Sequence, residues 1–504
     1  MRHLRLPFLL GLIAAALALP GIAHASNEQI SIMQDDDLLV YRGDAVRDQT
    51  LARMKAIGVD AVRVTVLWSV VADGARATKA LDKRFLKLGA DHPRAYSKVG
   101  WDKYDRLVRS CERLEIACYL NVTFPGPSWG HEKPPASQRR NRATWKPIPR
   151  EYGKFVRAVG KRFGGNYRDE NEPGRLPAVD MWSLGNEPNQ GGWLTPQWSG
   201  GKAASPALYR RLYAAGYEAL EATGHSGDTI YVGETAPLGS GKRTSRSPIR
   251  PKTFIRAMFR RGPAIKASGW AHHPYTKDLP PFQRDSAPDS ITMANFGELG
   301  TLLDDIAGRT RRVRKGMPLV STEFGYETSP PDPFRKTTLA QQATYNQIGE
   351  LLAWADPRVV GQSQFLLRDV PPNKRFRRGS KPYWFTYQSG LYNINDTPKP
   401  ALQSFVLPFL AAPAGGAGMT NFWGQLRFRP NDRPEEAPDQ VELQFKPANG
   451  ASDFAALGEK LRASSGKGYF TGTIKVPGPG QLRAVWTGPE LPGRAVSMPS
   501  DVGR

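Results

Sequence analysis

Cysteine is nearly absent from this sequence, with only Cys111 and Cys118 among 504 residues. A disulfide could join only these two, and it would act as a local staple because it closes a short loop. Two buried free thiols are the equal alternative. No cysteine stands at position 26, where a lipoprotein would need one directly after its signal; Ser26 is there instead.

Long apolar runs are also missing. Beyond the N-terminus, no segment offers the roughly 18 uninterrupted apolar residues of a membrane span. Residues 1–25 combine Arg2 and Arg5, a short apolar run and the small-x-small pattern that ends at Ala25, which together are typical of a cleaved secretory signal. The sequence therefore predicts a secreted protein, extracellular or periplasmic, that is cut after Ala25 and keeps 479 of the 504 residues.

Acidic residues are scarce relative to basic ones, with 47 Asp and Glu against 70 Lys and Arg and a formal charge of +23. The predicted signal holds two arginines and no acid, so the mature chain keeps +21. Basic runs at 139–142, 309–315 and 374–378 could favour anionic cell walls or acidic polysaccharides, or could form an ordinary solvated surface. None interleaves aromatic residues, so we expect no nucleic-acid partner.

Two further motifs are lacking. No glycine-rich phosphate loop follows the first predicted strand, which leaves a dinucleotide-binding fold without support. No group of His and Asp residues has metal-ligand spacing, so we predict neither a catalytic metal nor another cofactor.

What the sequence does contain is a regular alternation of β-branched runs and amphipathic stretches. Strands are predicted at 30–33, 61–67, 117–123, 179–184, 229–233, 268–272, 318–322 and 359–365. Helices are predicted at 47–57, 101–113, 150–163, 206–222, 251–259, 296–309, 338–354 and near 400–410. Eight such pairs favour an α/β fold, the (β/α)8 TIM barrel, over an open doubly wound sheet.

The pattern changes near residue 411. Residues 412–416 are typical of a linker, and alternating segments at 425–428, 440–445, 468–476 and 481–486 follow, separated by Gly-Pro turns. The sequence thus predicts a barrel domain over 26–411, followed by a linker and a small all-β, sandwich-like domain over 412–504.

Two carboxylates come directly after predicted strands, where the reacting groups of such barrels lie. Glu187 follows the fourth strand, and Glu323 ends the seventh. Asn171-Glu172-Pro173 repeats the tripeptide around Glu187, but no strand leads into it, so Glu172 is interpreted as a surface residue. Glu234, at the end of the fifth strand, is interpreted as a supporting or subsite group.

The motifs Gly185-Asn186-Glu187-Pro188 and Thr322-Glu323-Phe324-Gly325 resemble those of the large clan of retaining β/α-barrel glycosidases, clan A, with glycoside hydrolase families 5 and 39 (cellulase-like) nearest. The resemblance implies that Glu187 is the acid/base and Glu323 the nucleophile. It implies that Asn186 binds the sugar 2-hydroxyl.

Further positions fit the same clan. Arg63 matches the arginine of the second strand that holds the nucleophile ionised, and His273 and Tyr275 match a substrate contact and the tyrosine that orients the nucleophile. The histidine usual at the end of the third strand and the tryptophan usual in the eighth are absent. Trp384 or Phe365 could replace that tryptophan, and the family stays open.

The resemblance and the residues together predict a secreted retaining glycoside hydrolase that acts on an oligo- or polysaccharide. Retention needs two carboxyl groups about 5–5.5 Å apart with separated pKa values. Arg63 and Tyr275 are expected to keep Glu323 ionised, while Glu187 holds its proton near neutral pH. Transglycosylation, a non-catalytic carbohydrate- or wall-binding protein and a basic adhesion protein are the alternatives.

Overall fold

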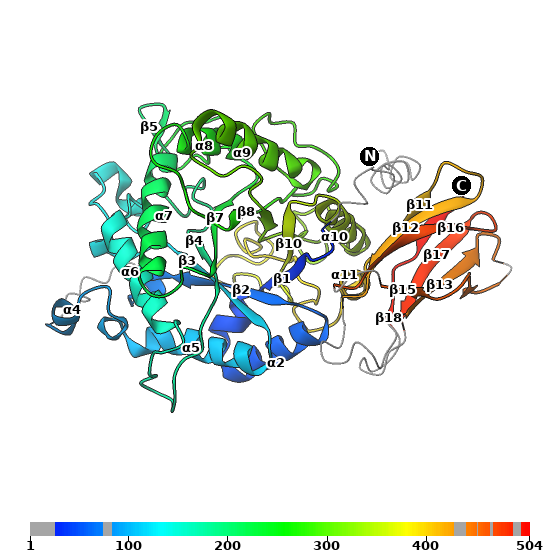
Figure 1. Cartoon of the computed structure of the whole chain (residues 1–504), viewed down its shortest axis with the longest axis horizontal. Helices are drawn as coiled ribbons and strands as arrows, with labels where there is room; N and C mark the ends of the chain where they lie inside the picture. The colour runs from blue at the N-terminus through cyan, green and yellow to red at the C-terminus, as the bar shows by residue number, and fades with distance from the viewer. Residues whose placement is uncertain are drawn as a thin grey trace.

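A computed structural model describes residues 26–73, 83–427, 440–450, 452–463, 467–486 and 495–503 (Figure 1). The predicted signal peptide, 1–25, lies outside these ranges, as does Phe428 of a predicted strand. Among the described residues, no helix has both the length and the apolar character that a membrane crossing requires.

Eight parallel strands close into a barrel, which confirms the predicted fold class (Figure 1). They are β1 (Ile30–Gln34), β2 (Ala61–Leu67), β3 (Ala117–Thr123), β4 (Met181–Leu184), β7 (Thr229–Thr235), β8 (Gly269–His272), β9 (Leu319–Ser321) and β10 (Val359–Phe365). The ring is closed by β1, which pairs with β10 on one side and β2 on the other. A cluster that includes Ile32, Tyr119, Tyr231 and Val320 fills part of the barrel interior as a packed core.

Helices surround the strands because each strand is followed by an amphipathic segment that must bury its apolar face. The larger ones are α2 (Asp44–Ala56), α5 (Lys98–Arg113), α6 (Pro149–Arg162), α7 (Ser205–Glu221), α8 (Pro251–Met258), α9 (Gly297–Thr310), α10 (Leu339–Trp354) and α11 (Pro400–Val406). Shorter elements in the loops are η2 (Asp37–Tyr41), α3 (Trp68–Val71), α4 (Lys83–Leu88), η4 (Pro93–Ala95), η5 (Ser128–Gly130), η6 (Ala136–Asn141), η7 (Met293–Asn295) and the hairpin of β5 (Trp198–Ser199) and β6 (Lys202–Ala203).

Local signals explain where several helices begin. Prolines 149, 251 and 400 stand in the first turn of α6, α8 and α11, where a missing N–H costs nothing. Thr338 and Gln341 form a capping box at the start of α10.

The C-terminal region is built from antiparallel strands in two sheets. One sheet contains β11 (Phe409–Pro413), β12 (Met419–Gln425) and β16 (Tyr469–Lys475), and the other contains β13 (Gln440–Pro447), β14 (Ala455–Ala456), β15 (Leu461–Arg462), β17 (Gly480–Trp486), β18 (Ala495–Val496) and β19 (Ser500–Val502). Phe409, Phe422 and Phe470 of the first sheet share a buried cluster with Leu443 and Trp486 of the second. The two sheets therefore enclose one core, which agrees with the predicted all-β region.

Two details of the prediction for this region are wrong. Residues 412–416 are not a free linker, because Ala412 and Pro413 belong to β11 and pair with Asn421 and Thr420 of β12. The predicted strand at 425–428 is also misplaced, since β12 ends at Gln425. Small side chains such as Ala411 and Ala412 bury well in a sheet but give little alternation in the sequence.

The β region packs directly on the barrel through α10. Ile348, Leu351 and Trp354 of this helix form a buried cluster with Trp423 and Tyr469 of the first sheet. Figure 1 shows α10 and α11 between the barrel and the β strands. The apolar contact favours a fixed arrangement of the two parts over independent movement.

Cys111 and Cys118 are free thiols, both buried, so the structure contains the second of the two alternatives. A hydrogen bond with Cys111, together with burial, raises the pKa of the Cys118 thiol well above its ordinary value. The protonated thiol is a poor nucleophile.

We expect a thiol reagent to titrate two groups per chain in unreduced, denatured protein and none in the folded protein, because folding hides both sulfurs. Spectrophotometric thiol counting measures this. A denatured, unreduced chain without titratable thiols would contradict it.

Candidate active site

The polar residues singled out in the sequence meet at the carboxyl ends of the barrel strands. Glu187 follows β4, Glu234 lies in β7, His273 follows β8 and Glu323 follows β9. Glu187 and Glu323 border a cavity of about 550 Å³. Its lining also includes Gln34, Asp36, Asn186, Gln190, Trp193, Tyr275, Phe365 and Tyr387, whereas Glu234 and His273 are buried and do not line it. Such a volume is within the usual range for a small-molecule site.

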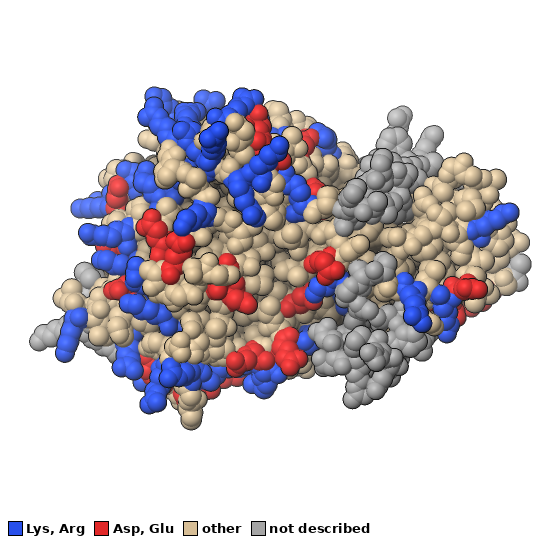
Figure 2. All heavy atoms as spheres, in the orientation of Figure 1, with Lys and Arg blue, Asp and Glu red and all other residues tan. Residues whose placement is uncertain are grey.

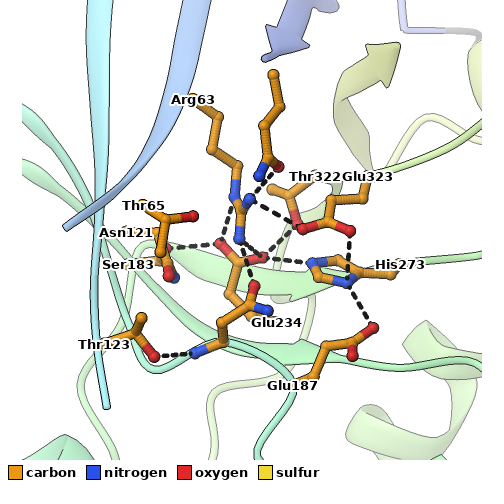
Figure 3. A network of polar contacts seen from close by, with 12 residues as sticks. Arg63, Thr65, Asn121, Thr123, Ser183, Glu187, Glu234, His273, Thr322 and Glu323 are labelled. Carbon is orange, nitrogen blue, oxygen red and sulfur yellow. Dashed lines mark hydrogen bonds and ion pairs between the residues drawn. The ribbon is translucent and has the colours of Figure 1, made fainter. Parts of the chain in front are cut away.

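Arg63 is a fully buried side chain whose guanidinium donates to four neighbouring side chains (Figure 3). Its guanidinium donates to Glu323 at 3.0 Å, to both carboxylate oxygens of Glu234 at 3.1 and 3.3 Å, and to the Asn186 side-chain oxygen at 2.7 Å. It also donates to Gln34. Arg63 thus lies beside Glu323, as the family resemblance implies. Its positive charge is shared between the carboxylates of Glu323 and Glu234.

Glu234 is the centre of the network (Figure 3). The sequence predicts a supporting or subsite group at this position. The side chain of Glu234 has no exposed surface, and it accepts hydrogen bonds of 2.6 Å from each of Tyr119, Ser183 and Thr322. Burial alone would raise the pKa of Glu234, but Arg63 and the His273 ring outweigh burial and lower it. Glu234 is therefore a permanent buried anion.

His273 bridges Glu234 to the two carboxylates that face the cavity. Its Nε2 lies 2.8 Å from Glu234, and its Nδ1 lies 3.1 Å from Glu187 and 3.4 Å from Glu323. Burial disfavours the charged ring, yet the three carboxylates raise the pKa of His273 to about 9. The imidazole is therefore a cation at neutral pH and donates from both nitrogens.

The charges of the network do not cancel when every carboxylate is ionised. Arg63 and His273 supply two positive charges, against three negative charges from Glu187, Glu234 and Glu323. An uncompensated charge in a buried site is costly, so the fully ionised network is disfavoured.

The electrostatics of Glu323 differ from the expectation. Tyr275 donates to it at 3.2 Å and Arg63 at 3.0 Å, as predicted. Burial nevertheless raises the pKa of Glu323 above its ordinary value, and the lowering by His273 and Arg63 does not cancel this. The two groups that are expected to keep Glu323 ionised are in place, but they do not lower its pKa, because Arg63 is shared with Glu234 and two further carboxylates lie close.

Glu187 and Asn186 sit on a strained turn after β4. Glu187 has a φ of +40° and Glu234 one of +47°, a left-handed conformation that costs a non-glycine residue about 1–3 kcal/mol. The Glu187 N–H donates to the Glu234 carbonyl at 2.9 Å, which ties the two turns together. Strain of this kind is typical of functional sites, and here it directs Glu187 into the cavity.

Asn186 is fixed from two sides. Its backbone N–H donates to the Thr123 hydroxyl at 2.7 Å, and its side-chain oxygen accepts from Arg63. Within the described residues its side-chain NH₂ has no partner, so this group remains available to a ligand in the cavity.

The aromatic residues of the cavity are Tyr41, Trp193, Tyr275, Phe365 and Tyr387. Trp384, which the sequence favoured as a substrate contact, is not among the residues that line it. It packs edge-on against Tyr383, with ring centroids 5.2 Å apart. The prediction for Trp384 is wrong, because in the loop after β10 it is Tyr387, three residues later, that lines the cavity. Phe365, the alternative to Trp384, does line the cavity.

Glu172 is far from this chemistry, as its sequence context indicates. It forms surface ion pairs with Arg106 and Arg109 at 3.4 and 3.7 Å, and 44% of its side chain is exposed. The residues around Glu172 and Glu187 are alike, but only Glu187 follows a barrel strand.

Glu187, His273 and Glu323 could in principle hold a metal ion, since one ligand atom of each lies within 4.8 Å of the others. A metal ligand must be a neutral imidazole. His273 is cationic at neutral pH, and both of its ring nitrogens are engaged by carboxylates. The residues present do not fit a metal.

Any catalytic activity of the site should therefore survive dialysis against EDTA with unchanged kcat and KM. The measurement is a rate assay before and after chelation. Loss of activity that Zn²⁺ or another divalent cation restores would show that the three residues bind a metal.

No family model matches this chain, and no curated protein matches it. Solved structures with similar backbones include a family 39 glycoside hydrolase from Bacteroides cellulosilyticus WH2 (14% identity, 89% of this chain and 82% of the other, TM-score 0.48). Another is a glucosidase from Croceicoccus marinus (12% identity, 90% of this chain and 94% of the other, TM-score 0.48). A third is GH5_18 from Streptomyces cattleya in complex with GlcNAc (16% identity, 76% of this chain and 79% of the other, TM-score 0.45). At these TM-scores the likenesses establish no activity for this chain, which has to be inferred from its own residues.

Proposed function

We propose that this protein is a retaining glycoside hydrolase that cleaves O-glycosidic bonds, β-linked ones by the family resemblance, through a covalent glycosyl-enzyme intermediate. One observation carries the proposal. A carboxylate oxygen of Glu187 and one of Glu323 lie within 4.8 Å of each other at a cavity. Retaining glycosidases hold their two carboxyl groups about 5–5.5 Å apart, whereas inverting enzymes leave about 6.5–9.5 Å for a water molecule.

In the first step, Glu323 attacks the anomeric carbon while Glu187 gives its proton to the glycosidic oxygen. The bond from the anomeric carbon to the leaving oxygen breaks, and an ester bond to Glu323 forms. In the second step, Glu187 removes a proton from water, the water oxygen bonds to the anomeric carbon, and the ester bond breaks. Both carboxyl groups then return to their starting protonation states.

The buried network supports both steps. Arg63 and Tyr275 hold the two oxygens of Glu323 in position, and the free NH₂ of Asn186 can donate to the sugar 2-hydroxyl. The cationic His273 donates toward both catalytic carboxylates and stabilises Glu187 once it has lost its proton. Glu234 keeps Arg63 and His273 charged in this dry environment.

The protein's export, with cleavage after Ala25, is part of the same proposal, since a polysaccharide substrate lies outside the cell. Its support is the signal pattern in residues 1–25.

The direct test is to trap the intermediate. An activated 2-deoxy-2-fluoro glycoside should inactivate the enzyme and add the mass of one sugar to the peptide that contains Glu323. NMR of the first product formed from an aryl glycoside should show retained anomeric configuration. A label on another residue, or an inverted first product, would overturn the proposed mechanism. A screen over β-glucans, mannans, xylans, galactans and host-type glycans then identifies the sugar.

The pH profile offers a separate check. Glu323 must be ionised to attack, and burial raises its pKa above the ordinary 4.5. We therefore expect kcat/KM on a small aryl glycoside to fall as the pH drops through a value above 4.5. A plateau that persists below pH 4.5 would contradict the raised pKa.

A further inference from the structure

A second, strongly basic groove lies outside the barrel between α7 and α8. It has a volume of about 880 Å³ and is lined by six arginines and one lysine, against a single acid, Asp289. Figure 2 shows Lys and Arg side chains crowded along the upper edge of the molecule, where Figure 1 places β5 and α8. We call this feature the basic groove.

Three of the arginines have partners. Arg256 pairs with Asp289 at 3.1 Å, so the only acid of the lining is already neutralised. Arg210 donates to backbone carbonyl groups, and Arg243 lies over the ring of Trp198 at 5.2 Å.

The other four cations are Lys202, Arg211, Arg260 and Arg261. Their side chains are exposed, and within the described parts of the chain none has an ion-pair partner. Like charges held together raise the local positive potential, and a concave, partly apolar wall focuses it. The positive potential of the basic groove therefore favours binding of an anion that carries several negative charges.

The basic groove shares its loops with the catalytic cavity. In the segment after β4, Gln190 and Trp193 line the cavity, whereas Trp198 lines the groove. In the segment after β7, Leu238 lines the cavity and Arg243 the groove.

We propose that the basic groove binds an anionic polysaccharide whose sugars carry repeated carboxylate or sulfate groups. Guanidinium groups pair with both anions through two parallel hydrogen bonds. A groove between two helices admits a single strand of sugars, whereas a flat bilayer cannot enter it. Nucleic-acid strands prefer a row of stacking aromatic residues, and Trp198 is the only aromatic side chain in the lining. The binding does not depend on the proposed hydrolysis.

The test compares two triple variants of the full protein with equal loss of charge. Arg211→Gln/Arg260→Gln/Arg261→Gln removes three of the four cations of the basic groove that have no ion-pair partner among the described residues. Arg375→Gln/Arg377→Gln/Arg378→Gln removes three exposed arginines from the loop after β10 and is the matched control. Binding of polygalacturonate, heparin and neutral galactan is measured by titration calorimetry at low and high NaCl, with Tm as the check on folding.

We expect the groove variant to bind polygalacturonate or heparin at least 10-fold more weakly than the wild type, and the control variant to stay within 2-fold. Which polymer responds distinguishes carboxylate from sulfate recognition. Equal loss in both triple variants would show diffuse charge attraction and overturn the proposal. So would tighter binding of duplex DNA or phosphatidylglycerol vesicles at the groove, or no binding of either acidic polymer by the wild type.

Discussion

Glu323→Gln should reduce hydrolysis of an activated aryl glycoside by about 10⁴-fold or more, since removal of a covalent nucleophile can cost about 10⁶ in other enzymes. The amide has the shape of the carboxylate but cannot attack the anomeric carbon. It can still interact with Arg63 and Tyr275, so the fold should persist. Steady-state rates and Tm measure the two effects.

Azide separates the roles proposed for Glu187 and Glu323. In Glu323→Gly, azide should replace the missing carboxylate in one displacement and give a glycosyl azide of inverted configuration. In Glu187→Ala, azide should intercept the ester on Glu323 and give the retained azide. The opposite pair of products would show that Glu187 is the nucleophile and Glu323 the acid/base. Full activity of Glu323→Gln would show that Glu323 is not the nucleophile.

Glu234→Gln should be the most damaging change apart from changes to Glu187 and Glu323, the proposed catalytic pair. It removes the buried anion that neutralises Arg63 and His273 and leaves their charges partly unpaired. Breaking a buried ion pair costs about 3–5 kcal/mol of stability. We also expect kcat/KM to fall by about 10²-fold, a loss similar to that of one preorganised electrostatic group.

The pH dependence of stability distinguishes loss of the network from a general destabilisation. The pKa of Glu234 is lowered by folding, so its contribution to stability is present above about pH 4.5 and is lost as the pH falls. The pKa of His273 is raised from 6.5 to about 9, so its contribution is present below pH 6.5 and is lost as the pH rises through 9. In Glu234→Gln the pKa of His273 should move down, and the alkaline loss of stability should begin at lower pH.

Glu172→Gln is the control for Glu234→Gln, because it makes the same chemical change at a glutamate whose ion pairs lie on the surface. Its exposed ion pairs are worth about 0–1 kcal/mol. Activity and Tm should therefore stay close to the wild type. If Glu234→Gln behaves like Glu172→Gln in chemical denaturation and in its pH profile, Glu234 does not maintain the network.

The barrel was predictable because its signals are local. A strand covered on both faces is rich in apolar and β-branched residues, as β2 and β3 are. These two strands and β10 have the bounds that the sequence predicts. Strand ends also place Glu187 and Glu323 at one end of the barrel. The β region was less predictable, since β11 is rich in small residues and was interpreted as a linker in part.

The sequence by itself determined the order of strands and helices and the two glutamates that face the cavity. Only the tertiary structure decided how the charges pair. Arg63 and Glu234 are 171 residues apart and belong to strands that are not neighbours, so they meet only when the barrel closes. Burial strengthens the ion pair between Arg63 and Glu234. Because Arg63 also pairs with Glu234, its positive charge is only partly available to Glu323. Closure also decided that Tyr387 and Phe365, and not Trp384, line the cavity.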